Sequence, residues 1–352
     1  MIDIHSLVSE AFAKGASDVH LSVGVPPIYR IDGVLVVQKQ YAPVSAKDLL
    51  DAVQKIFEQL NITRSEDKKE VDFAFSVGDK IRVRGNLYHE RKNPALALRL
   101  ITSRIRTFSE LGLPEILKDF ANRDSGLILV AGPTGSGKST TLAAMIDYIN
   151  ENFPYHIITI EDPIEYVFTN KRSIIHQREL GQDTNSFYDG LKYALRQDPD
   201  VILVGEMRDL ETMALALTAA ETGHLVLSTI HTNSAASAPE RIIDVFPAHQ
   251  QKQIALQVAN TLIAIVYQRL LRHASGKGVV PVLEILVGTT AVKNLIRENK
   301  LHQIESIMQA SAKQGMILFD DALLKAYFSG LIDKNQLYEY CRNPEEMRRK
   351  IG

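Results

Sequence analysis

Residues 132–139 carry the most specific chemistry in this sequence. They run Gly-Pro-Thr-Gly-Ser-Gly-Lys-Ser and satisfy the pattern G-x-x-x-x-G-K-[ST] in full. Glycines let such a loop curl until its N–H groups point at phosphate oxygens, and a following helix adds its positive N-terminal end. We expect the Lys138 ammonium to reach the β- and γ-phosphates of ATP and the Ser139 hydroxyl to bind Mg²⁺. The predicted nucleotide-binding residues are Gly132, Pro133, Thr134, Gly135, Ser136, Gly137, Lys138, Ser139 and Thr140, the last nearer the α-phosphate.

The elements around this loop predict an α/β fold. An apolar strand at 127–131 precedes the loop, and an apolar helix begins near Lys138. Helical stretches alternate with further apolar strands, which is typical of a parallel sheet with crossover helices. From residue 239 onward the chain is predicted to be mostly helical, with a hairpin within residues 272–287. The further strands are expected at 156–160, 201–204 and 225–229.

Carboxylates follow two of the predicted strands. Glu161, Asp162 and Glu165 follow the second strand, and Glu206 follows the third. Open α/β sheets bind ligands at the carboxyl ends of their strands, so one of these acids could polarise the attacking water. Glu206 stands where a P-loop sheet usually presents an aspartate to the Mg²⁺ shell. Taken alone, the acids after either strand would most simply be solvated loop residues or helix caps. Their joint placement on the sheet of a phosphate-binding loop favours a catalytic role.

Two histidines frame the fourth predicted strand, His224 before it and His231 after it. A lone histidine is more often structural than catalytic, so the residues alone leave a nucleotide contact of His231 open. The hydroxyls of Ser228 and Thr229 are equally ambiguous.

Composition limits the other functions. The 352 residues have a formal charge of -2, which argues against the whole-protein basic field of a strong nucleic-acid binder. The single cysteine, Cys341, can form neither an internal disulfide nor a site of paired thiolates, which favours a reducing, cytoplasmic compartment. No apolar run approaches the roughly 18 to 20 residues that span a bilayer, so we expect any membrane contact to be peripheral.

The pattern predicts a change of character along the chain. Residues 1–99 have mixed helical and alternating periodicity, which indicates a small α+β domain. Residues 100–113 show little periodicity and are predicted to be a linker. The predicted ATPase core covers residues 114–288, and residues 289–352 form a helical C-terminal region.

The four segments at the predicted strand ends together resemble the Walker A, Asp box, Walker B and His box of the type II/IV secretion ATPase superfamily. The likeness is greatest to its pilus retraction branch and covers nearly the whole chain. Residues 291–298, Ala-Val-Lys-Asn-Leu-Ile-Arg-Glu, are similar to the AIRNLIRE motif of that branch, with Val292 and Lys293 as conservative departures. Matching segments also include residues 15–21 (Gly-Ala-Ser-Asp-Val-His-Leu) and 206–212 (Glu-Met-Arg-Asp-Leu-Glu-Thr).

This resemblance implies roles for the residues that match its motifs. Glu165 would be the general base, Glu206 would hold a Mg²⁺-bound water, and His224 and His231 would form the His box. The family fold implied is a PAS-like N-terminal domain followed by a RecA-like ATPase domain, with residues 100–113 as the hinge. The implied function is an ATP-hydrolysing motor that powers type IV pilus retraction.

The resemblance also implies a homohexameric ring in which one subunit donates arginines to ATP bound by its neighbour. A cation supplied only on domain closure would couple hydrolysis to movement. The implied partner is the inner-membrane platform protein of the pilus, which would provide the only membrane contact. The candidate arginines are Arg82, Arg84 and Arg99, which could instead be exposed strand residues, and Arg208, which could instead form an interface ion pair.

Four alternatives stay open. Pilus-assembly and type II secretion ATPases share the four boxes, but they usually carry a longer N-terminal region and a four-cysteine zinc insertion. An accessory paralogue of the retraction motor would share every motif. A RecA-like nucleic-acid motor is disfavoured by the neutral charge balance, so we expect no stable nucleic-acid partner. A nucleotide-gated adaptor would bind ATP without turnover.

Overall fold

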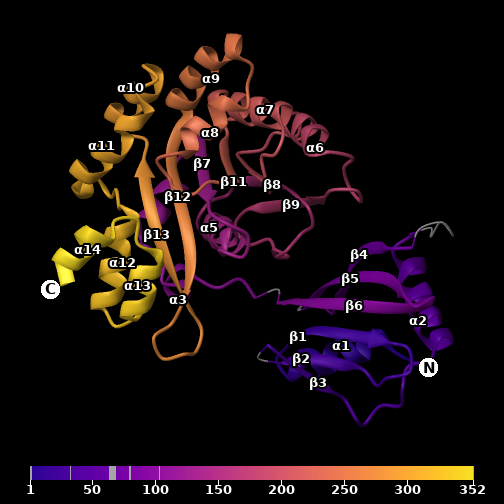
Figure 1. Cartoon of the computed structure of the whole chain (residues 1–352). Helices are drawn as coiled ribbons and strands as arrows, with labels where there is room; N and C mark the ends of the chain where they lie inside the picture. The colour runs from indigo at the N-terminus through magenta and orange to yellow at the C-terminus, as the bar shows by residue number, and fades with distance from the viewer. Residues whose placement is uncertain (1, 32, 63–68, 79–80, 103, 352) are drawn as a thin grey trace. The chain divides into compact units, whose positions relative to one another are not determined.

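The computed structural model describes residues 2–31, 33–62, 69–78, 81–102 and 104–351. It divides the chain into two compact units (Figure 1). The first holds Met1–Arg104 together with Glu165–Val167, and the second holds Ile105–Ile164 and Phe168–Gly352. Ser103, within the predicted linker, lies outside the described residues. None of the described helices is long and apolar enough to cross a membrane.

The first unit is built on a six-stranded antiparallel sheet, in the order β3-β2-β1-β6-β5-β4. Its core is formed by alternate strand residues such as Val19, Val83 and Leu98, packed with apolar residues of two helices. The strands are β1 (Ala16–Ser22), β2 (Ile28–Ile31), β3 (Val34–Val37), β4 (Val71–Val77), β5 (Ile81–Glu90) and β6 (Asn93–Thr102), and the helices are α1 (Ile4–Ala13) and α2 (Ala46–Gln59).

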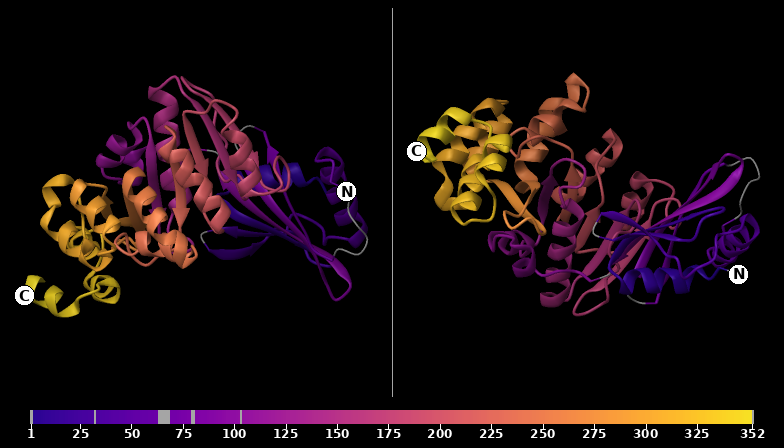
Figure 2. Two further views of the ribbon diagram at one scale, coloured as in Figure 1. Left: turned by 90° about the horizontal axis from the view of Figure 1, so that it is seen from above. Right: turned by 60° about the horizontal axis from the view of Figure 1, so that its bottom comes forward.

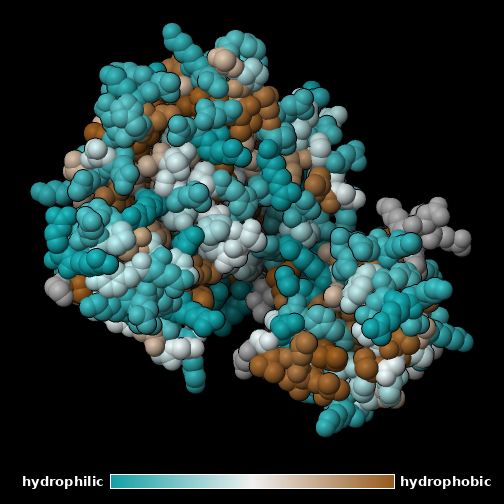
Figure 3. Space-filling view, viewed as in Figure 1, coloured by the Kyte–Doolittle hydropathy of each residue, from teal (hydrophilic) through white to brown (hydrophobic). Residues whose placement is uncertain are grey.

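Edge strand β3 exposes an unusual amount of apolar surface. Its residues Val34, Leu35, Val36 and Val37 are 64%, 52%, 39% and 45% exposed. They form part of the brown hydrophobic surface over this strand in Figure 3. The free side of an apolar edge strand is a surface that another chain can cover.

The second unit is built on a seven-stranded sheet, in the order β13-β12-β7-β11-β10-β8-β9. Every pairing is parallel except that of β12 with β13, which form a hairpin. The hairpin predicted within residues 272–287 is correct for its turn and second strand. Its first strand begins at Leu262, in a stretch predicted to be mostly helical, because these apolar residues pair with β7 inside the sheet. The predicted mixed α/β fold is therefore confirmed. The strands are β7 (Gly126–Ala131), β8 (His156–Glu161), β9 (Ile174–Glu179), β10 (Val201–Val204), β11 (Leu225–Ile230), β12 (Leu262–Arg272) and β13 (Val279–Val287).

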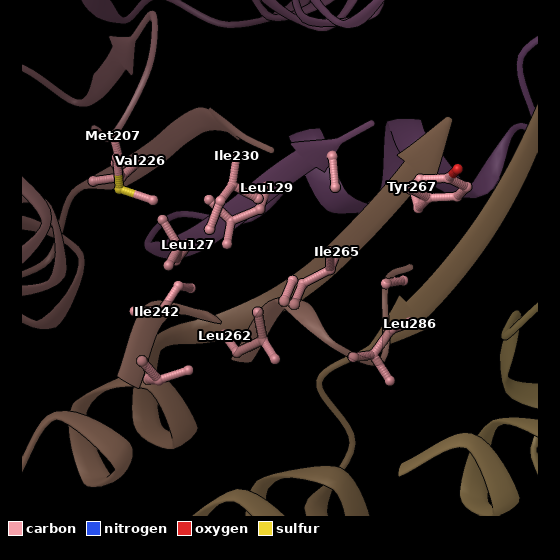
Figure 4. Close-up of a cluster of buried hydrophobic side chains, with 14 of the residues drawn as sticks. Leu127, Leu129, Met207, Val226, Ile230, Ile242, Leu262, Ile265, Tyr267 and Leu286 are labelled. Atoms are coloured by element: carbon pink, nitrogen blue, oxygen red, sulfur yellow. The ribbon is translucent and has the colours of Figure 1, made fainter. Parts of the chain in front are cut away.

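Helices cover both faces of this sheet because successive strand residues point to opposite sides. Leu127 and Leu129 of β7 join one apolar cluster (Figure 4), and Ile128 and Val130 join the other. The second cluster contains residues of α3 (Phe108–Leu111), α4 (Ile116–Ala121) and α5 (Lys138–Asn152). The first contains residues of α6 (Phe187–Ala194), α7 (Leu210–Glu221), α8 (Ala238–Asp244) and α9 (Ala248–Thr261).

The C-terminal segment is mostly helical and packs on the side of the unit where β12 and β13 lie (Figure 2). Its buried residues, among them Met308, Leu323 and Met347, join the same cluster as Leu127. This segment therefore belongs to the second unit. Its helices are α10 (Thr290–Arg297), α11 (Ile304–Ala310), α12 (Phe319–Phe328), α13 (Lys334–Tyr340) and α14 (Pro344–Ile351), with short 3₁₀ turns at Leu301–Gln303 and Ala312–Gln314.

Candidate nucleotide site

The loop after β7 has the conformation of an anion cradle. Gly132, Gly135 and Gly137 have φ angles of 143°, 77° and 83°, a region that residues with a Cβ atom rarely adopt. Gly137 is the N-cap residue of α5, and no side chain caps that helix end. Lys138 Nζ donates to the carbonyl oxygens of Gly132 and Pro133, each at 3.0 Å. The ammonium group therefore lies over the loop, beside the uncapped end of the helix.

Two details of the loop fit a bound phosphate. The Ser136 hydroxyl is buried, and no hydrogen-bond partner for it is present among the described residues. At Gly132 an added Cβ would lie 2.4 Å from the Gln268 carbonyl oxygen and 2.7 Å from Ser136 Oγ, so a side chain has no room there. The loop thus combines a tightly enclosed backbone with a polar atom that needs a partner.

Glu206 lies at the same edge of the sheet as the loop. It follows β10, and β11 separates β10 from β7, so the two strand ends are about 10 Å apart. Glu206 contacts Arg208 Nε at 2.8 Å and His231 Nε2 at 3.3 Å. The structure therefore brings three of the predicted site residues together, with the carboxylate 19% exposed.

The hydroxyls of Ser228 and Thr229 hold the backbone that carries Glu206. Ser228 Oγ donates to the Val204 carbonyl, and Thr229 Oγ1 donates to the Gly205 carbonyl, each at 2.7 Å. Both hydroxyls therefore bond to the end of the neighbouring strand. This resolves the ambiguity that the sequence left for these two residues.

His224 lies at the other edge of the sheet. It precedes β11, whereas the loop follows the far end of β7, about 20 Å away along the strands. Its Nδ1 lies 3.0 Å from the Ala219 carbonyl oxygen at the end of α7. Within one chain the structure does not bring His224 to the loop.

The carboxylates after β8 separate into two surroundings. Glu161 Oε1 accepts hydrogen bonds from Thr159 Oγ1 at 2.6 Å and from Gln177 Nε2 at 3.1 Å. Glu165 is grouped with the first unit, where it accepts a hydrogen bond from Arg84 Nη2 at 3.0 Å. The structure thus pairs two predicted site residues, Glu165 and Arg84.

The three arginines predicted to act across a subunit boundary lie on one face of the first unit's sheet. Arg84 stands directly opposite Arg99 in the β5–β6 pairing, and Arg82 lies two residues along β5. Arg82 Nη1 donates to Ser76 Oγ at 3.3 Å, and Arg99 Nε donates to Asp18 Oδ1 at 3.1 Å.

Asp18 is fixed as a negative charge in this row of arginines. Burial alone would raise its pKa, but hydrogen bonds from Ser17 and Arg99 hold the pKa below its usual range. Arg99 is 68% exposed, so its guanidinium is also accessible from solvent.

Comparison with known proteins identifies a family to which a chain with this loop, Glu206 and His231 is similar. Residues 1–337 match the family model described as type II/IV secretion system protein. The chain belongs to the type II/IV secretion system protein family.

Particular members of this family are similar over most or all of their length. The type IV pilus retraction ATPase PilT of Pseudomonas aeruginosa is 43% identical over 98% of this chain and 99% of its own. A twitching motility protein of Neisseria gonorrhoeae is 46% identical over 86% of this chain and 81% of its own. A crystal structure of the pilus retraction motor PilT with bound ADP has a TM-score of 0.89 and 46% identity, covering 99% of this chain and 100% of that one. These matches confirm the resemblance to retraction ATPases indicated by the motifs.

One residue that contacts the loop of this secretion-family chain was missed from sequence. Gln268 lies in β12, is 2% exposed, and hydrogen-bonds to Ser136 and Thr141. The available signal was a glutamine directly after the apolar run 262–267. A buried amide needs partners, but the sequence does not show which groups they are.

A second missed group supports the loop that follows His231. Glu284 of β13 is fully buried and accepts hydrogen bonds from both Arg342 and the backbone N–H of Ala235. Arg342 also donates to the Asn233 carbonyl at 3.0 Å. An acid inside the apolar run 279–287 was the signal in this case.

Proposed function

We propose that this chain is the ATPase motor that powers type IV pilus retraction. One observation carries the proposal: a complete phosphate-binding loop shares its sheet edge with Glu206 and His231, in a chain similar from end to end to a retraction ATPase. The chain is a member of an ATPase family, and a similar protein binds ADP. We therefore assign ATP as its substrate.

The loop residues would bind the nucleotide through main-chain N–H groups, with Lys138 moving its ammonium to the β- and γ-phosphates. Magnesium is usually held by one or two protein groups together with substrate phosphates. Two residues fit this role. Ser139, in the first turn of α5, would bind the ion directly, and Glu206, at the same edge of the sheet, would bind it through a water molecule. When bound, the ion would neutralise charge on the phosphates.

Glu165 is proposed as the general base. It would take a proton from the water that attacks the γ-phosphorus, while the bond to the β-phosphate oxygen breaks and ADP leaves. The contacts of Glu206 with His231 and Arg208 would fix its carboxylate during this step. Glu165→Gln should keep ATP binding and lose turnover, and undiminished steady-state hydrolysis would count against this role.

At a finer level we infer a PAS-like domain at residues 1–99 and a RecA-like core at 114–288. Residues 100–113 would be the hinge and 289–352 a helical extension. Domain closure in a homohexameric ring would bring the arginine row of one subunit to ATP held by its neighbour. The exposed apolar strand β3 supports self-association, because such a surface favours being covered. Light scattering that gave a monomer mass with and without nucleotide would contradict the ring.

The proposed location is the cytoplasmic face of the inner membrane, reached through the pilus platform protein. Deleting the gene in its own organism tests the function. A retraction motor predicts excess surface pili and no twitching, restored by the wild-type gene but not by Lys138→Ala. Bald cells would indicate an assembly motor, and normal twitching would indicate an accessory paralogue; either would refute the proposal.

A further inference from the structure

Strand β12 places an amide side chain against the phosphate-binding loop. β12 lies beside β7, and the parallel register sets Tyr267 opposite Ala131. Gln268 is therefore level with Gly132, the first residue of the loop. Although these two positions are 136 apart in the chain numbering, the sheet brings them together because β12 is the direct neighbour of β7.

The amide of Gln268 bonds to the loop and to the first turn of α5, the helix that follows it. Its Nε2 donates to the Ser136 carbonyl at 2.7 Å, and its Oε1 accepts from Thr141 Oγ1 at 2.7 Å. All three residues are almost completely buried: Gln268 is 2%, Ser136 3% and Thr141 1% exposed. Water has little access, so the protein groups themselves must satisfy one another.

The glycines of the loop are shaped around the same residue. A Cβ on Gly132 would lie 2.4 Å from the Gln268 carbonyl oxygen, and a Cβ on Gly137 would lie 2.9 Å from Gln268 Nε2. The loop therefore packs on Gln268 through its first glycine, its last glycine and the first turn of α5. A different loop conformation would leave the Ser136 carbonyl and the amide without partners, which carries a free-energy cost.

We propose that Gln268 is a positioning residue that fixes the loop in its phosphate-binding shape and thereby sets nucleotide affinity without touching the nucleotide. The inference rests on the proposed function of the loop as an ATP site. Glutamine suits the task because one end of its amide donates and the other accepts. A glutamate would turn an acceptor toward the Ser136 carbonyl, and a methionine of similar shape would offer neither bond.

The test uses four single variants of the full chain: Gln268→Met, Gln268→Glu, Thr141→Val, and Gln257→Met as a matched control on α9. Gln257 bonds to Glu221 through Nε2, and neither residue belongs to the loop. Calorimetry gives the Kd for ADP, and phosphate release gives KM for ATP and kcat. Thermal unfolding separates loss of affinity from loss of fold.

We expect both Gln268 variants to raise the Kd for ADP and the KM for ATP by about tenfold or more, because a buried carbonyl loses its donor. Because we expect the loop backbone that Gln268 positions to bind the ground state and the transition state alike, kcat at saturating ATP should change by only about threefold or less. Thr141→Val removes only the hydrogen bond from Thr141 to Gln268 and leaves that from Gln268 to the Ser136 carbonyl. This variant should lose about threefold in affinity for ADP. Gln257→Met should match the wild type.

Affinities of the Gln268 variants within twofold of the wild type would overturn the inference, whether or not their stability changed. A fall in kcat with KM and Kd unchanged would also overturn it. The proposed function fails separately, if the wild-type chain itself neither binds ADP nor releases phosphate from ATP.

Discussion

Replacing Arg342 by alanine would leave the Glu284 carboxylate buried in the second unit without its counter-ion. Glu284 has no exposed surface, and Arg342 donates to its two oxygens at 2.6 and 3.0 Å. The only other donor that the described contacts give Glu284 is the Ala235 N–H at 2.7 Å. Without the guanidinium, this carboxylate keeps its desolvation cost and loses its counter-ion.

The size of the stability loss follows from the burial of the two side chains, Glu284 being fully buried and Arg342 partly exposed. Removing one partner of a buried ion pair costs about 3 to 5 kcal/mol. The Arg342 side chain is 34% exposed, so water can partly replace it and the lower end, ~3 kcal/mol, applies. For a unit of this size that corresponds to a fall in Tm of roughly 6 to 12 °C. The loop after His231 should loosen as well, because Arg342 also holds the Asn233 carbonyl.

Calorimetric unfolding of the full chain measures the effect on the second unit. The double variant Arg342→Met with Glu284→Leu removes both charges and should recover most of the loss. Lys350→Ala is the matched control, because Lys350 pairs with Asp321 at the surface and should contribute less than about 1 kcal/mol. A Tm for Arg342→Ala no lower than that of Lys350→Ala would refute the reasoning.

Three further predictions concern the site and the first unit. Glu206→Gln should lower phosphate release by about 10- to 100-fold while ADP binding by calorimetry stays near the wild type; equal loss of both would place Glu206 in nucleotide binding instead. Gly132→Ala should abolish ADP binding, because its Cβ would meet a backbone carbonyl at 2.4 Å in addition to the strain of a positive φ angle, whereas Gly135→Ala adds backbone strain without a clash and should weaken binding less; similar losses would contradict the steric account. Burial lowers the pKa of His20 in the folded protein below 6.5. The folded state therefore binds this proton less readily than the unfolded chain, so the first unit loses stability as pH falls from above 6.5 toward the pKa of the folded state. His20→Gln should therefore reduce the drop in thermal stability of the first unit between pH 7 and pH 5, and an unchanged drop would exclude His20 as its source.

Local patterns explain why the phosphate-binding loop and the α/β fold could be predicted. The loop is a contiguous motif whose flanking strand and helix are also contiguous, so residues 127–152 contain all the information needed. Glu206 was predictable for a similar reason, since the carboxyl ends of parallel strands meet at one edge of a sheet. His224 stands before its strand, and the same rule puts it at the opposite edge. Its grouping with the site came from the resemblance.

The supporting groups depend on strand order, which no local pattern contains. Gln268 reaches the loop only because β12 is inserted beside β7, and Glu284 meets Arg342 only because the C-terminal helices pack near β13. Ser228 is a third case, because its hydroxyl could have faced a ligand or a neighbouring strand. Because β10 pairs with β11, the Ser228 hydroxyl donates to the Val204 carbonyl of the neighbouring strand.

Phosphate release from ATP by the wild-type chain and by Lys138→Ala tests the central claim most directly. Lys118→Ala is the control, since Lys118 lies in α4, outside the loop, and pairs there with Glu115 at the start of the same helix. We predict steady release by the wild type and by Lys118→Ala, and a loss of about 100-fold or more in Lys138→Ala, because the cation that neutralises the β- and γ-phosphates is gone. Hydrolysis by Lys138→Ala at the wild-type rate would contradict the assignment of the loop after β7 as the ATP site.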